Sequence, residues 1–169
     1  MLTNIDIDIL LTFAEVAAAF AGFSAIAGII GGRSREIAQQ DAERLRAVIL
    51  NSILVLIAAF SPLLFARFGL DDNNVWRVAS GIVLPCNWLV AILLTYLGTQ
   101  TKLWRTDKIY TSVSFALEIP IEVALIANVL GFFAGVAPAL YMTSIFLILL
   151  QSAVAFATLL HSLISQHKN

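Results

Sequence analysis

Seven polar residues interrupt long apolar stretches of this sequence, and their side chains are the ones that could do chemistry. They are three carboxylic acids and four amides: Glu15, Glu118, Glu122, Asn51, Asn87, Asn128 and Gln151. If the stretches cross a membrane, each acid costs about 2.5–3.5 kcal/mol to insert, so each needs an explanation. Acidic groups inside a membrane favour cations, which indicates binding of a proton or a monovalent cation.

Two of the acids belong to one constellation. Glu118 and Glu122 are four residues apart, so on a helix they share a face. Pro120 lies between them and lacks a backbone N–H, which leaves the carbonyl of Ala116 without its helical donor. Two carboxylates beside a free carbonyl suit a proton or a cation. The alternative is structural, because Arg46 could reach Glu118 and form a static ion pair.

The other polar groups are less specific. No Lys or Arg lies at the depth expected for Glu122, so its carboxyl should be protonated, hydrated or bound to a cation. Arg67 or Arg77 could reach Glu15 from the outer edge. The amides have a simpler explanation, because hydrogen bonds between membrane helices contribute about 0.6 kcal/mol each and commonly serve packing.

Depth sorts the seven residues into layers. Counting about 1.5 Å per residue from the middle of each stretch gives three groups: Glu122, Asn87 and Gln151 at the midplane, Glu15 and Asn128 toward the outside, and Glu118 and Asn51 toward the cytoplasm. Since lipid offers no hydrogen bonds, we expect these side chains to face one another or a subunit interface.

Composition shows which elements must position these groups. Of 169 residues, 60% are hydrophobic and 12% are charged, too few charges to cover a water-soluble globule. Five apolar runs reach the roughly 20 residues that a membrane helix needs. They lie approximately at 8–31, 45–67, 76–98, 114–135 and 139–162. The sequence therefore predicts one all-α domain, a polytopic membrane protein with five transmembrane helices.

The basic residues predict its orientation. Eight of the ten Lys and Arg residues fall in the loop after the first run, the loop after the third run and the C-terminal tail. Because Lys and Arg stay in the cytoplasm, the N-terminus should be outside and the C-terminus cytoplasmic, in an inner or plasma membrane.

The first run is rich in small residues. Ser24, Gly28 and Gly32 follow one another at four-residue spacing, which allows another helix to approach closely. Gly22 should share a second face with Glu15, so this acid should point into a tight contact. Five helices per chain are few to enclose an aqueous path, which favours a homo-oligomer.

Several function classes are excluded or disfavoured. No phosphate-binding loop, HExxH or GxSxG motif is present, no His lies in the interior of a run, and the near-neutral charge offers no field for nucleic acid. We expect no catalytic residues, metal or cofactor, with an intramembrane lipid enzyme as a remote alternative. The favoured hypothesis is an oligomeric proton or cation channel or carrier that uses the carboxylates. The competing hypothesis is a structural or accessory subunit of a membrane complex.

Overall fold

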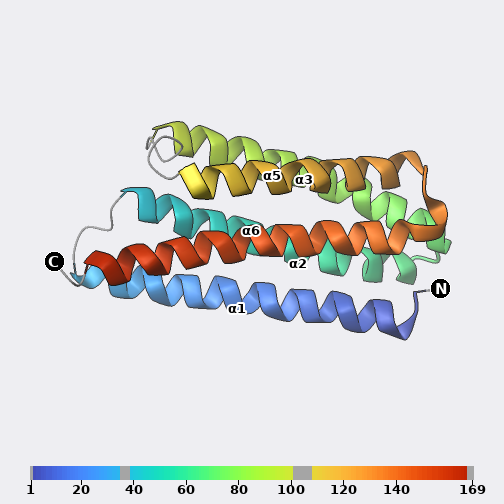
Figure 1. The fold of residues 1–169 in the computed structure, drawn as a ribbon. Coiled ribbons are helices and arrows are strands. Elements are labelled where there is room, and N and C mark those ends of the chain that lie inside the picture. The colour runs from blue at the N-terminus through green and yellow to red at the C-terminus, as the bar shows by residue number, and fades with distance from the viewer. Residues whose placement is uncertain (1, 35–38, 101–107, 167–169) are drawn as a thin grey trace.

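The fold is a bundle of long helices. The computed structural model describes residues 2–34, 39–100 and 108–166 (Figure 1). In chain order the elements are α1 (Asn4–Ser34), α2 (Gln39–Arg67), α3 (Asp72–Gln100), α5 (Lys108–Leu130), the short 3-10 helix η1 (Ala134–Val136) and α6 (Ala137–Gln166). All five long helices are long and apolar enough to cross a membrane, which confirms the predicted helical class and the five apolar runs. The inside–outside orientation stays a prediction.

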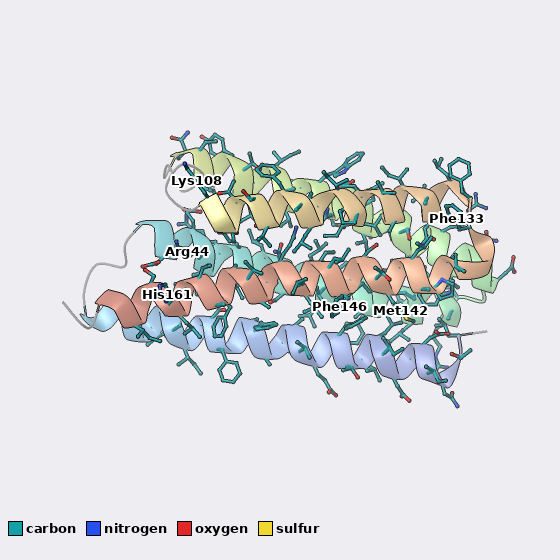
Figure 2. All side chains as sticks on the ribbon, viewed as in Figure 1. Arg44, Lys108, Phe133, Met142, Phe146 and His161 are labelled. Atoms are coloured by element: carbon teal, nitrogen blue, oxygen red, sulfur yellow. The ribbon has the colours of Figure 1, made fainter. Side chains whose placement is uncertain are left out.

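Four of the helices form a ring. α2 packs against α3, α3 against α5, α5 against α6, and α6 against α2. α1 lies outside this ring, against α2 and α6 (Figure 1). We call the end with the short connections α2–α3 and α5–α6 the turn end. The opposite end, where α1 and α3 end, is the loop end. Arg44, Lys108 and His161 lie at the loop end and Phe133 at the turn end (Figure 2).

The turn end is closed by defined backbone geometry. Gly131 has φ +75°, a left-handed conformation that disfavours side chains other than hydrogen. Its N–H donates to the carbonyl of Asn128 at 3.0 Å, and Phe132 N–H donates to the carbonyl of Ala127 at 3.2 Å. This pair of bonds is a Schellman cap, which terminates a helix. α5 therefore ends before the limit of the predicted run 114–135.

A buried tyrosine supplies the donor that a proline removes. Pro62 lies inside α2 and cannot donate to the carbonyl of Ala58, which is four residues earlier. The Tyr141 hydroxyl of α6 donates to that carbonyl at 2.8 Å. Trp76 packs on the Tyr141 ring with centroids 5.5 Å apart, and both side chains are buried. Their positions near the outer ends of two apolar runs predict that both aromatics anchor the chain at the membrane surface, but they pack in the core of the turn-end half.

The row of small residues in α1 packs within the chain. Ser24 is fully buried, and a Cβ on Gly28 would lie 3.0 Å from the Leu45 side chain of α2. This close approach explains the small residues without a second subunit, so the row does not support the expected homo-oligomer. Gly22 lies on another face with open space around it. The surroundings of Gly32 fall outside the described part of the chain.

Candidate functional site

One amide joins the two carboxyl groups of α5. The side-chain N–H₂ of Asn87, on α3, donates to Glu118 Oε1 at 2.7 Å and to Glu122 Oε1 at 2.9 Å. Asn87 is 3% exposed, so this junction lies inside the helix ring. The two carboxyls also interact directly with each other. The i, i+4 spacing therefore produces a carboxyl pair, with Asn87 as its shared donor.

The second oxygen of each carboxyl has its own donor. Gln151 Nε2, on α6, donates to Glu118 Oε2 at 3.0 Å and to the Ser114 carbonyl at 3.1 Å. Trp88 Nε1 donates to Glu122 Oε2 at 2.5 Å. Each of the four carboxyl oxygens thus accepts one side-chain hydrogen bond. Trp88 was not among the candidates from sequence, although its position next to Asn87 at the midplane was the available signal.

The pair has no basic partner among the described residues. Arg46 bonds Glu43 Oε1 through Nη1 at 2.6 Å, three residues away on the same helix. The expected ion pair between Arg46 and Glu118 is therefore wrong. Glu43 lies about one turn from Arg46 on α2, so the Arg46 side chain bonds Glu43 instead of extending across the bundle to Glu118. The donors that surround the carboxyls are neutral amides and an indole, which supply hydrogen bonds but no compensating charge.

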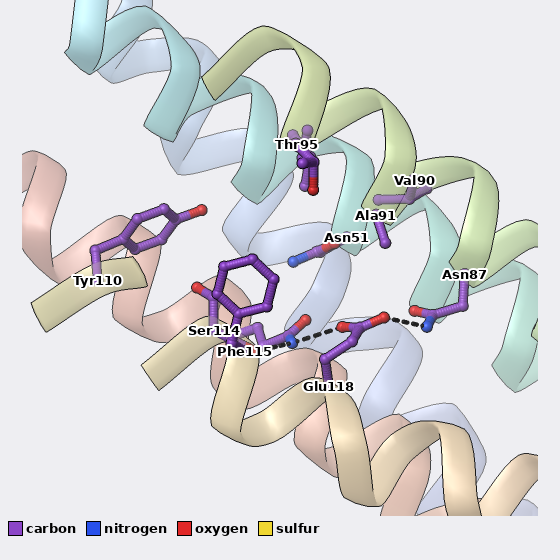
Figure 3. Close-up of a pocket in the computed structure, with 11 residues that line it drawn as sticks. Asn51, Asn87, Val90, Ala91, Thr95, Tyr110, Ser114, Phe115 and Glu118 are labelled. Carbon is purple, nitrogen blue, oxygen red and sulfur yellow. Dashed lines mark hydrogen bonds between the residues drawn. The ribbon is translucent and has the colours of Figure 1, made fainter. Parts of the chain in front are cut away.

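A cavity of about 60 Å³ begins at the pair and extends toward the loop end (Figure 3). All four helices of the ring line it, with Asn51, Asn87, Val90, Ala91, Leu94, Thr95, Tyr110, Ser114, Phe115, Glu118 and Gln151. At about 15 Å³ per water, the space holds about four water-sized groups. The Glu118 carboxyl, with its bonds to Asn87 and Gln151, forms one wall (Figure 3).

Asn51 is a polar side chain of this cavity with no hydrogen bond to another described residue. Its side chain projects into the space from α2 (Figure 3) and is 6% exposed. Within residues 2–34, 39–100 and 108–166 it has no hydrogen-bond partner. A buried amide without partners costs about 1–3 kcal/mol, unless the cavity supplies a partner. Asn51 therefore presents a polar group to the cavity, where water or a ligand could supply its hydrogen-bond partner.

Five of the seven predicted residues come together here, and two do not. Asn51, Asn87, Glu118, Glu122 and Gln151 join the predicted inner and middle layers into one cluster. This occurs because Asn87 reaches both turns of α5 at once.

Asn128 and Glu15 lie apart from this cluster. Asn128 donates to the carbonyl of Ala137 at 3.0 Å, at the start of α6. Glu15 is exposed on α1 and has no partner within the described ranges. Glu15 therefore does not point into a tight contact of this chain, because α1 turns that face away from α2 and α6. Arg77 does not approach it, since its Nε donates to the carbonyl of Val129 at 3.4 Å.

The described residues contain no group of three or more His, Cys, Asp or Glu side chains placed to hold a metal ion. Comparison with protein families, curated proteins and solved structures finds no match to this chain. The chemistry of the site therefore rests on its own side chains: two carboxyls with neutral donors, beside a small cavity.

Proposed function

We propose that this protein is a membrane carrier that binds and moves a proton or monovalent cation through the Glu118–Glu122 pair. The observation that carries the proposal is the single Asn87 amide bonded to both carboxyls. Two carboxylates this close cannot both keep a full charge away from bulk water. Because their donors are neutral, a proton or a cation must supply the compensation. The pair should therefore bind a proton or a cation.

The surroundings of the pair favour a carrier over an open pore. On the loop-end side lies the cavity with Asn51. On the turn-end side lie Val83, Leu125 and Tyr141, which are fully buried and pack in one apolar core. The pair thus borders a cavity on one side and a packed apolar core on the other, and this asymmetry supports a carrier. With the orientation predicted from Lys and Arg, the cavity lies on the cytoplasmic side of the pair.

Two prolines supply places where the helices could bend around the pair. Pro120 lies between the two acids of α5, and Pro85 lies two residues before Asn87 on α3. Each removes one helical hydrogen bond and permits a kink. Movement of α3 against α5 would change the contact that Asn87 makes with both carboxyls.

Proton flux into reconstituted vesicles tests this function. The purified protein is placed in vesicles with a pH-sensitive dye inside, and a potassium gradient with valinomycin drives the flux. Glu122→Gln and Glu118→Gln should each lower the flux at least tenfold, because the amide keeps the shape but cannot release a proton. Asp8→Asn, an acid-to-amide change on exposed α1 away from the pair, should leave the flux unchanged. Flux that survives in a folded Glu122→Gln protein would contradict the proposal.

The accessory-subunit hypothesis has one observation in its favour. Glu15, Ala18, Ala19 and Gly22 lie exposed on α1, so an acid and small residues share a face with no partner in the chain. An acid exposed to lipid is costly, and small residues allow a helix to approach. This face suits another membrane helix, from a second copy or from a different protein. Absent flux in the unmodified protein, together with loss of assembly in Glu15→Leu, would favour this second function.

A further inference from the structure

The cavity at the loop end has the chemistry of a site for a small organic cation. Four of its lining residues are apolar or largely so: Val90, Ala91, Leu94 and Phe115. The other seven lining residues are polar: Asn87 and Gln151 bond the Glu118 carboxyl, and Asn51, Thr95, Tyr110 and Ser114 lie along the rest of the cavity. A small-molecule site usually combines apolar surface with polar groups that fix the ligand's orientation, and this cavity offers both. A bare metal cation is held by oxygen ligands and gains nothing from the apolar wall.

The amides leave their oxygens available. Asn87 and Gln151 use their nitrogens to bond the carboxyls. No hydrogen bond within the described ranges engages either amide oxygen, or any side-chain atom of Asn51. An ammonium group carries three N–H donors and no acceptor, so it matches a site with spare oxygens. Asn51 is 6% exposed and projects into the cavity, so its oxygen is a preformed acceptor (Figure 3).

We propose that this cavity binds a small primary ammonium ion with a short apolar tail, with Glu118 as its counter-charge and Asn51 as an acceptor. The inference rests on the proposed function, in which Glu118 and Glu122 compensate a bound cation. If the carboxyl pair keeps one proton, it carries one negative charge, which a single ammonium neutralises.

Size and shape limit the ligand. A cavity of about 60 Å³ accepts about four water-sized groups. Ethylammonium has three non-hydrogen atoms, so it fits with one of them as the charged head. Its two carbons would lie along Val90 and Leu94, and the ring of Phe115 would add a favourable contact with the cation. Tetramethylammonium carries the same charge but has no N–H donor, so it should bind poorly.

Direct binding tests the inference without any transport. Isothermal titration of the full-length protein in lipid nanodiscs measures binding of ethylammonium chloride. Sodium chloride, potassium chloride, tetramethylammonium chloride and ethanol serve as separate controls. We expect ethylammonium to bind at least tenfold more tightly than each control. Equal binding of sodium or potassium, or no binding of ethylammonium, would overturn the inference.

Variants locate the site. Asn51→Leu keeps the volume of the side chain but removes the acceptor, and should weaken binding at least tenfold. Glu118→Gln should abolish it. Ala91→Leu fills the cavity from α3 without changing a polar group, so it should also abolish binding. It tests the same site even if Asn51→Leu folds poorly. Ile92→Leu, on the exposed face of the same helix, is the matched control and should bind normally. Unchanged binding in folded Ala91→Leu would place the ligand elsewhere and refute the proposal.

Flux and binding separate the two proposals. Ethylammonium binding without proton or cation flux would support the binding site and contradict the carrier function. Flux that depends on Glu122, without ethylammonium binding, would support the carrier function and contradict the organic ammonium as its ligand.

Discussion

The turn-end half and the loop-end half of the ring use the same four helices, but they treat buried polar groups differently. In the turn-end half the Ala58 carbonyl, freed by Pro62, is bonded by Tyr141, and Trp76 packs over that contact. In the loop-end half Asn51 remains without a partner beside an open cavity. Two buried atoms of the turn-end half, Ser80 Oγ and Asn128 Oδ1, also lack a partner within the described residues, but neither residue lines the cavity. The difference therefore lies in access to the cavity: the turn-end half packs, and the loop-end half would bind the ligand of the proposed function.

The largest expected effect comes from placing the same acid in each half of α3. Ala79 is fully buried in the turn-end core, whereas Ala91 lines the cavity. Ala79→Asp should lose about 3–5 kcal/mol of the free energy of unfolding, because a buried charge has no partner there. Ala91→Asp should lose much less, since the cavity can hydrate its carboxyl. Unfolding in mixed micelles measures both values, and equal losses would show that the halves do not differ.

A smaller effect is expected at the sealed carbonyl. Tyr141→Phe removes the donor to Ala58 and should cost about 1–3 kcal/mol, the penalty for a buried acceptor left without a bond. Pro62→Ala restores a backbone N–H, so the double variant should recover most of that loss. Tyr96→Phe, at an exposed ring of α3, is the control and should have little effect. A double variant no more stable than Tyr141→Phe would show that Tyr141 does not replace the missing helical bond.

Asn51 and Asn128 are buried asparagines that do not bond the carboxyls, so the same substitution can be compared in the two halves. We expect their losses of unfolding free energy to differ by about 1 kcal/mol. Asn128 donates to Ala137 in the turn-end half, whereas Asn51 has no partner in the described ranges. Asn128→Leu should therefore destabilise the protein by about 1 kcal/mol in the same micelle unfolding assay, and Asn51→Leu should stay within about 0.5 kcal/mol. The opposite order would mean that Asn51, rather than Asn128, holds the bundle together.

The last prediction leaves stability unchanged and fixes the side on which each half lies. In a Cys86→Ser background, Asp72→Cys at the turn end should react with an impermeant maleimide added outside intact cells. Thr106→Cys, between α3 and α5, should react only after the membrane is opened. This pattern follows from the eight-to-two distribution of Lys and Arg. Reversed labelling would place the cavity on the outside.

The sequence predicts the five helices well because a membrane helix is recognised from the length and hydropathy of its apolar run alone. It also identifies the polar residues, since any acid or amide in an apolar run is exceptional. Rotation of each helix about its axis is harder, because a membrane helix is apolar on all sides and gives little amphipathic signal. For that reason Glu15 was expected in a contact and is exposed, while Trp76 and Tyr141 lie in the core instead of at the surface.

The merging of two predicted layers has a similar cause. Depth along a helix is counted from residue numbers, and Glu118 and Glu122 differ by about one turn. A side chain on a neighbouring helix can bridge that turn, as Asn87 does, but its direction follows from packing that residue counts do not contain. The bond between Arg46 and Glu43 is likewise a local choice that outcompetes a distant partner.

The hydrogen bond from Trp88 to Glu122 also makes the site observable by light. Indole fluorescence responds to the charge and the hydrogen bonding at its ring nitrogen, so the emission of Trp88 should follow the state of the carboxyl beside it. Trp76 is buried against Tyr141 in the other half and provides an internal reference from the same chain. With Trp104 replaced by Phe, the chain carries one indole at the carboxyl pair and one away from it, so no added label is needed to test whether a proton or a cation binds there.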